Sequence, residues 1–352
     1  MDFRLSEDAL MLAETVERMM LDTCTPAHLR RLAASGEARD AKRWGQIVAM
    51  GLPGMCAPVE RGGSELDTVA VLLVAEACGR VALPEPLIEH AGVAVPLLAA
   101  TGAEPGLLDA AIAGEALLAV GHPINPFVAH ADGAEALLLA HEGELHLVPT
   151  AAVTLRRRES LDEFRRLFEV AWTPSAATRI ADAATGRRLW AAALERGALL
   201  TAGEALGLAK GAIDLAVDYA KVREQFGKPI GVNQAVKHML ADQQVKLSFA
   251  RPVVLAAAAD LAAGDLVSTS RVSHAKLAAT AAADSAARTA VQVFGAMGMT
   301  AEAGVNFYVK RALALLGAWG SSAFHRDRIA ARVLDGGPVG PENGFIRYGA
   351  AA

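Results

Sequence analysis

The chain has 352 residues, of which 53% are hydrophobic and 5% aromatic, and its formal net charge is −5. A chain of this length and apolar content buries a large core in two or three domains, which excludes a disordered or fibrous protein. The mild negative charge gives no reason to bind nucleic acid or an anionic membrane, so we expect neither partner. Three well-separated cysteines, without a Cys/His cluster, indicate neither a disulfide framework nor a zinc site.

The start of the chain shows no targeting segment. Residues 1–6 contain no apolar signal region, and charges interrupt the alanine-rich stretches before they could span a bilayer. We therefore expect a cytoplasmic protein.

Helical periodicity dominates residues 1–114. Apolar residues recur at helical spacing over 6–20, behind Ser6, a residue typical of an N-cap. The pattern predicts further helices, separated by glycine and proline, over 44–50, 66–78, 90–100 and 106–112. We expect an N-terminal helical domain over 1–114.

The pattern of apolar residues is no longer helical over residues 115–183. Short apolar runs between glycines and prolines predict a small β domain, with strands near 116–120, 136–140, 145–148 and 167–172. Long helical patterns return over 184–335 and indicate a helical bundle, followed by a Gly/Pro-rich tail over 336–352. The sequence thus predicts a mainly α protein with a small central β domain, although helical blocks alone would also suit a binding module.

Three motifs carry a resemblance to a known family: REQFGKPI at 223–230 with Gln234 and LAD at 240–242, QVFGAMG at 292–298, and APVERGG at 57–63. They resemble the R-x-x-F-G-x-P-I, Q-x-F-G-G-x-G and P-E-x-x-G-G signatures of the acyl-CoA dehydrogenase family. The resemblance implies a helical domain, a β domain and a C-terminal four-helix bundle, in that order. It also implies FAD as cofactor, an acyl-CoA as substrate and electron-transfer flavoprotein as acceptor.

The first motif suits phosphate binding. Arg223 and Gln225 lie where a helix ends before the Gly227 turn, so a fixed cation and an amide can reach a diphosphate. Taken alone, Arg223 is also explained as a charge that complements the helix dipole, and Phe226 as an ordinary core residue.

The second motif makes phosphate binding more specific, because two motifs at the family's separation occur in one chain. Glycines let backbone N–H groups approach a phosphate, and Gln292 adds an amide. In the family both segments reach across a dimer interface to a neighbour's FAD, which implies a tetramer and a homologous dehydrogenase subunit as partner. The FAD contacts implied for this chain are Arg223, Gln225, Phe226, Gln234, Gln292, Gly295 and Gly298.

The usual catalytic base has no counterpart. In the family a glutamate of a Y-E-G-T segment removes the α-proton of the acyl-CoA while the β-hydrogen leaves as hydride to the flavin. Here the matching segment is GAWGSS at 317–322, so Trp319 or Gly320 takes that position and neither accepts a proton. Some members carry the base on the first bundle helix instead, at the position of Gly197. Glu195 lies two residues earlier, about 200° around the helix.

Glu195 is nevertheless a candidate base, and the alternative is a solvated carboxylate at a helix start. His325 is a third candidate, which we expect to be exposed and without a partner. Gly197, as a small residue near the acyl end, would enlarge the pocket and favour bulky thioesters such as steroid or branched acyl-CoA.

The flavin loop is also reduced. Family members carry T-E-P-x-x-G-S-D and then W-I-T/S, whose backbone and hydroxyl contact the flavin. This chain has His122-Pro123 at the first position and residues 127–129, FVA, at the second, so fewer donors remain for the ring.

Three hypotheses follow from these departures. The first is a subunit of a heterotetrameric acyl-CoA dehydrogenase that completes the FAD site of its partner. The second is an autonomous homo-oligomeric dehydrogenase that uses Glu195. The third is a non-enzymatic scaffold without flavin.

Overall fold

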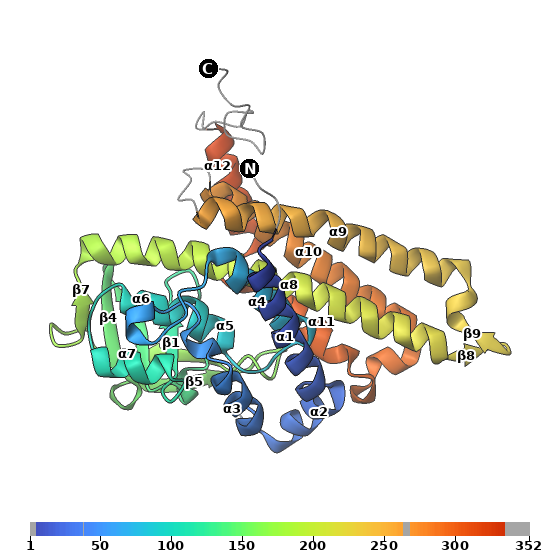
Figure 1. Ribbon diagram of the computed structural model, residues 1–352, viewed down its shortest axis with the longest axis horizontal. Coiled ribbons are helices and arrows are strands. Elements are labelled where there is room, and N and C mark those ends of the chain that lie inside the picture. The colour runs from blue at the N-terminus through green and yellow to red at the C-terminus, as the bar shows by residue number, and fades with distance from the viewer. Residues whose placement is uncertain (1–4, 38, 263–267, 335–352) are drawn as a thin grey trace.

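The computed structural model describes residues 5–37, 39–262 and 268–334. Helices at both ends of the chain flank two small sheets, so the mainly α class with a central β region is confirmed (Figure 1). The predicted tail over 336–352 lies outside the described residues.

The N-terminal helices begin at side-chain caps. Ser6 accepts a hydrogen bond from the Ala9 N–H at 3.2 Å, and Asp67 accepts one from the Ala70 N–H at 2.7 Å. The expected helix over 6–20 is therefore present and slightly longer. The helices are α1 (Glu7–Thr23), α2 (Pro26–Ser35), α3 (Ala41–Ala49), α4 (Thr68–Arg80), α5 (Leu87–Glu89), α6 (Val95–Ala99) and α7 (Pro105–Ile112).

Two sheets form the middle of the chain. One has the order β1-β3-β4-β7, in which β1 and β3 are parallel and the other pairs antiparallel. The other is antiparallel, with the order β2-β6-β5. The strands are β1 (Leu118–Gly121), β2 (Val128–Ala129), β3 (Ala136–His141), β4 (Glu144–Pro149), β5 (Thr154–Arg158), β6 (Leu167–Ala171) and β7 (Arg179–Ala181).

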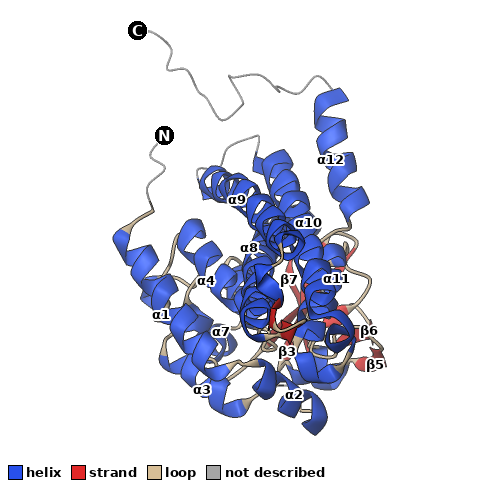
Figure 2. Cartoon of the chain, turned by 90° about the vertical axis from the view of Figure 1, so that its right-hand side faces the viewer, coloured by secondary structure: helices blue, strands red, loops and turns tan. Residues whose placement is uncertain are grey.

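Long helices form the C-terminal bundle, which Figure 2 views along its length. Asp182 caps the first of them by accepting a hydrogen bond from the Thr185 N–H at 2.8 Å. This helix also joins the bundle to the sheets, because the Trp190 indole N–H donates to the Glu144 carbonyl at 3.2 Å. The elements are α8 (Ala183–Val222), β8 (Glu224–Gln225), β9 (Lys228–Pro229), α9 (Gln234–Ala262), α10 (Ser268–Phe294), α11 (Val305–Gly317) and α12 (Ser322–Leu334).

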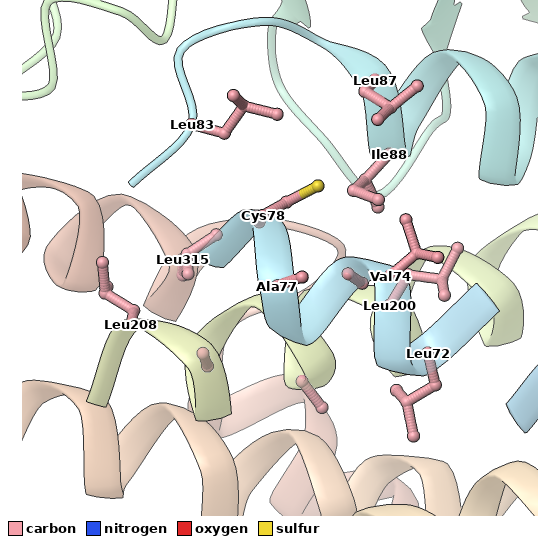
Figure 3. Close-up of a cluster of buried hydrophobic side chains, with 14 of the residues drawn as sticks. Leu72, Val74, Ala77, Cys78, Leu83, Leu87, Ile88, Leu200, Leu208 and Leu315 are labelled. Carbon is pink, nitrogen blue, oxygen red and sulfur yellow. The ribbon is translucent and has the colours of Figure 1, made fainter. Parts of the chain in front are cut away.

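A shared core joins the N-terminal helices to the bundle. Figure 3 shows Cys78 and Ala77 of α4 among leucines of the 83–88 segment, α8 and α11. All these side chains are buried, so the helical blocks before and after the sheets form one continuous core. Desolvation raises the pKa of the Cys78 thiol well above its usual value, so this cysteine is an inert core residue.

Helices α4 and α8 approach so closely that only glycine fits at their contact. A Cβ placed on Gly207 would lie 1.8 Å from the Glu76 carbonyl oxygen, and one on Gly79 would lie 1.9 Å from the Glu204 carbonyl oxygen. Backbone atoms cannot give way as a flexible side chain can. The glycines therefore fix the distance between the two helical blocks.

We expect Gly207→Ala to lower the free energy of unfolding by about 1–3 kcal/mol, because the added methyl group overpacks this contact. Gly45→Ala is the matched control: a Cβ on this exposed glycine of α3 meets no heavy atom within 4 Å. Its higher helix propensity should raise stability by about 0.5–1 kcal/mol. Denaturant unfolding followed by circular dichroism measures both; equal stability of the two variants would contradict the close approach.

The sequence patterns missed the least regular elements. Helix α2 was not expected, and neither were strands β5 and β7. β5 reads TLRRR and shows little of the apolar alternation that marks a strand; it forms because it pairs with β6 along its length.

Candidate functional site

The two predicted phosphate-binding segments lie at the same end of the bundle. The Tyr219 ring near the end of α8 stacks on the Phe294 ring at the end of α10, with centroids 4.1 Å apart and planes at 13°. Arg223 follows Tyr219 as the C-cap of α8, and its N–H donates to the Tyr219 carbonyl at 2.8 Å. This stack brings the start of the β8–β9 hairpin next to the start of the 292–298 turn (Figure 1).

The hairpin exposes its motif residues. Phe226 has φ 54° and Gly227 φ 76°, which turns the chain tightly at the tip. Phe226 is 99% exposed, so its interpretation as a core residue is wrong. Arg223 and Gln225 are exposed as well, and Arg223 forms no side-chain ion pair with the residues that the structure describes.

The second segment is also accessible. Gln292 and Gly295 are exposed, and Gly295 has φ 61° with no heavy atom within 4 Å of a Cβ placed on it. Gly298 is buried, and a Cβ placed on it would lie 2.8 Å from the Val291 carbonyl oxygen. A glycine at this position therefore allows the turn to pack closely on the end of α10. Gln234 is the exposed first residue of α9. The end of the bundle thus offers the Arg223 cation, several amides and open backbone.

Trp319 is one of the two residues that the sequence matches to the family's base, and the structure buries its indole. Trp319 is 2% exposed and packs directly on α8, because a Cβ on Gly197 would lie 2.2 Å from the Trp319 ring. Two of the candidate base positions, 197 and 319, are therefore in contact with each other. The expectation that Gly197 enlarges an acyl pocket is wrong, since the indole takes up the space over it.

Polar groups hold Trp319 in this position despite its unusual backbone, with φ 53°. The backbone N–H of Trp319 donates to the Asn125 side-chain oxygen at 2.9 Å. Its carbonyl oxygen pairs with His325 Nε2 at 2.9 Å, and the Lys276 ammonium group donates to the carbonyl of Gly320. Burial lowers the pKa of Lys276 to about 7, and the lysine serves here as a buried clamp on the turn.

The reduced flavin loop packs against the same tryptophan. His122 is buried between Trp190 and Trp319, with ring centroids 5.4 Å and 5.5 Å away. Its Nε2 pairs with the Trp190 carbonyl at 3.0 Å and its Nδ1 accepts from the Ile124 N–H at 3.0 Å. Ala129, in place of the family's threonine or serine, has no hydroxyl. Because aromatic rings fill this region and the hydroxyl is missing, these residues do not fit a flavin ring held by this chain.

Glu195 is largely shielded from solvent rather than solvated. It forms an ion pair with Arg328 of α12, and the two side chains are 12% and 17% exposed. Burial raises the pKa of Glu195, although the nearby Arg328 charge opposes this. Its role as a base stays a prediction, but the carboxylate is engaged by an arginine.

His325 is not the exposed residue that the sequence predicted. It is 0% exposed and pairs with the Ser273 hydroxyl at 3.0 Å as well as with Trp319. Burial lowers the pKa of His325 to about 4. Its neighbours were invisible in the sequence, because Ser273 lies 52 residues away on another helix.

This shift predicts an acid-sensitive fold. Since the folded pKa of His325 lies below the ordinary value of about 6.5, the unfolded chain binds its proton first, and stability falls as pH drops from 6.5 towards 4. His325→Gln should reduce this pH dependence by up to about one proton. Urea unfolding at several pH values measures it, with His238→Gln, at an exposed site on α9, as control. Parallel curves for wild type and His325→Gln would contradict the assignment.

Among the described residues no group of His, Cys, Asp and Glu side chains is placed to hold a metal ion. Within the same residues no helix is both long and apolar enough to cross a bilayer.

The fold and the motif-bearing bundle end define a flavin-dependent dehydrogenase architecture, and comparisons identify the family. Residues 6–105 match the acyl-CoA dehydrogenase N-terminal domain and residues 184–334 the C-terminal domain. The chain is 31% identical over 315 residues to the acyl-CoA dehydrogenase IpdE2 of Mycolicibacterium smegmatis, covering 88% of this chain and 93% of that protein. The chain therefore belongs to the acyl-CoA dehydrogenase family, and this membership implies the use of FAD.

Solved structures share the whole fold. A chain of the ChsE4-ChsE5 complex from Mycobacterium tuberculosis superposes with a TM-score of 0.84 at 23% identity, covering 95% of this chain and 99% of that one. Butyryl-CoA dehydrogenase from Megasphaera elsdenii superposes with a TM-score of 0.84 at 19% identity, covering 95% and 100%. At these identities the likeness concerns the fold.

Proposed function

We propose that this chain is the non-catalytic subunit of an acyl-CoA dehydrogenase complex and completes the FAD site of a homologous catalytic subunit. One contrast carries the proposal. The predicted phosphate-binding residues are exposed, whereas Trp319, which the sequence matches to the base position, is buried against Gly197. A chain that kept only its own catalytic site would show the opposite pattern.

The exposed end has the chemistry to hold the diphosphate of FAD. The Arg223 guanidinium offers paired donors of fixed geometry, and the amides of Gln225 and Gln292 add neutral donors. Open backbone at Gly295 permits close approach of a phosphate. When bound, FAD would supply the hydride acceptor, and the part of this chain would be to bind and orient the dinucleotide.

Assembly from two different chains has a parallel among the structural relatives, since ChsE4-ChsE5 is described as a complex. In our proposal the catalytic partner keeps the base and the flavin-ring site and dehydrogenates the acyl-CoA between its α and β carbons. Electron-transfer flavoprotein would be the electron acceptor of the complex.

Co-expression with the dehydrogenase encoded by the neighbouring gene tests the proposal. We expect a yellow complex that holds FAD and reduces an artificial acceptor with acyl-CoA, while this chain purified alone contains little flavin. Stoichiometric FAD and turnover in the chain alone, abolished by Glu195→Gln, would instead establish an autonomous dehydrogenase. Two colourless proteins that do not associate would reject the subunit role and favour a scaffold.

A further inference from the structure

A cavity opens between the N-terminal helices and the bundle. Helix α4 packs against α1 on one side and against α8 and α9 on the other, as Figure 2 shows, and these four helices line the cavity. Its volume is about 320 Å³, and sites for small molecules typically measure about 300–1,000 Å³. The lining contains no residue of the 83–89 segment, the 223–230 hairpin, the 292–298 turn or the Trp319 turn, so this is a separate site.

Apolar side chains form the floor of the cavity. They are Leu10 and Ala13 of α1, Leu73 and Ala77 of α4, and Leu247 of α9. The last three are buried at the bottom, whereas Leu10 is 40% exposed at the edge. A hydrocarbon chain placed on this floor leaves water, and each buried methylene group then improves binding roughly fourfold.

Two cations of the lining keep hydrogen-bonding capacity that the protein does not use. The Lys210 ammonium group has several N–H donors, and its side-chain partner in the described chain is Asp214. Arg251 donates from Nε to the Glu76 carboxylate, at 3.0 Å and 3.3 Å to its two oxygens. Both Nη groups of Arg251 are left without a partner among the residues that the structure describes. A ligand can therefore accept hydrogen bonds from both side chains.

The acidic side chains of the lining are paired or exposed. Glu17 forms an ion pair with Arg80, and Glu76 forms one with Arg251. Glu14 is exposed, so water solvates it. The unused capacity inside the cavity thus consists of donors on cations, which favours an anionic ligand.

We propose that this cavity binds a medium-chain carboxylate, with its head group between Lys210 and Arg251 and its hydrocarbon chain on the floor beside Leu73. The two Nη groups of a guanidinium present parallel N–H donors that match the two oxygens of a carboxylate. At roughly 30 Å³ for each water-sized group, a volume of 320 Å³ holds about ten non-hydrogen atoms. Octanoate has that size.

The bound carboxylate joins the N-terminal helical domain to the bundle. Its head group contacts α8 and α9, and its chain contacts α1 and α4. Because the unfolded chain has no such site, binding raises the temperature of unfolding by mass action. This inference does not rest on the proposed subunit role.

Calorimetric titration of the full chain with octanoate, octanamide and hexanoate tests the proposal. Octanoate should bind saturably. Octanamide has the same chain without the charge and should bind at least tenfold more weakly. Hexanoate is shorter by two methylene groups and should bind about tenfold more weakly than octanoate. High salt should weaken octanoate binding, because the Lys210 and Arg251 side chains are 38% and 39% exposed.

Variants of the lining separate this site from binding elsewhere. Lys210→Gln and Arg251→Gln should each weaken octanoate binding at least tenfold and reduce its effect on the unfolding temperature. Lys237→Gln is the matched control, at an exposed position of α9 outside the cavity, and should change neither. Ala13→Phe should fill the floor and abolish binding, with circular dichroism to establish that this variant folds.

Three results would overturn the proposal: no saturable binding of octanoate, equal binding of octanamide and octanoate, or binding that Lys210→Gln and Arg251→Gln leave unchanged. The last result would place the acid elsewhere in the chain. None of these measurements needs FAD or a partner subunit, so the subunit role is judged separately.

Discussion

Replacing Arg223 by glutamine in this chain alone should strip FAD from its complex with a wild-type dehydrogenase partner. A hydrogen bond to a charged group contributes about 1.5–3 kcal/mol, so its loss should weaken FAD binding roughly 10- to 150-fold. The released flavin is measured by fluorescence during dilution of the complex. Because the partner is unchanged, a loss of FAD would mean that this chain contributes to the site across the interface.

The control is Arg157→Gln, which removes the same charge from an exposed position of β5. It should leave the FAD content unchanged. Neither Arg223→Gln nor Arg157→Gln should change the free energy of unfolding measured with denaturant. A second change, Gln292→Ala, should also weaken FAD binding. The effects of Arg223→Gln and Gln292→Ala should be less than additive if both side chains contact the same diphosphate. Equal retention of FAD by Arg223→Gln and Arg157→Gln would refute the contact.

The sequence located the exposed segments 223–230 and 292–298, for which phosphate binding stays a prediction, because each segment is encoded locally. The residues 223–230 form a short hairpin that depends on a helix end, a glycine and a proline, all adjacent in the chain. The same holds for the turn at 295–298. Local signals of this kind survive in a single sequence, and so do long amphipathic helices and their caps.

The packing of Trp319 against Gly197 could not be predicted from the sequence, because it depends on contacts between distant segments. The contact of Trp319 with Gly197 joins two helical regions, and its polar support comes from Asn125, Lys276 and His325 on three other segments. The sequence predicted that the family's base has no counterpart at 317–322. It could not show that its replacement fills the space, nor that Lys210, remote from every motif, lines a cavity.

The Trp319–Gly197 contact can be tested by a double-mutant cycle. Trp319→Ala should lower the free energy of unfolding by about 3–5 kcal/mol, since it empties a fully packed site. Gly197→Ala should cost about 1–3 kcal/mol in the wild-type chain, because its methyl group would lie 2.2 Å from the indole. In the Trp319→Ala background the same change should be neutral or stabilising, as alanine favours a helix more than glycine does.

Direct contact should give a coupling energy on the order of 2 kcal/mol between the two changes. Phe226→Ala is the control that should leave stability unchanged, because the Phe226 side chain is 99% exposed. Additive effects of Trp319→Ala and Gly197→Ala would mean that the indole does not lie over the glycine.

The contact of Trp319 with Gly197 also bears on catalysis. If the indole only blocks an otherwise intact site, Trp319→Glu should restore acyl-CoA oxidation by this chain. We expect it to stay inactive, because His122 and Ala129 still lack the groups that hold a flavin ring.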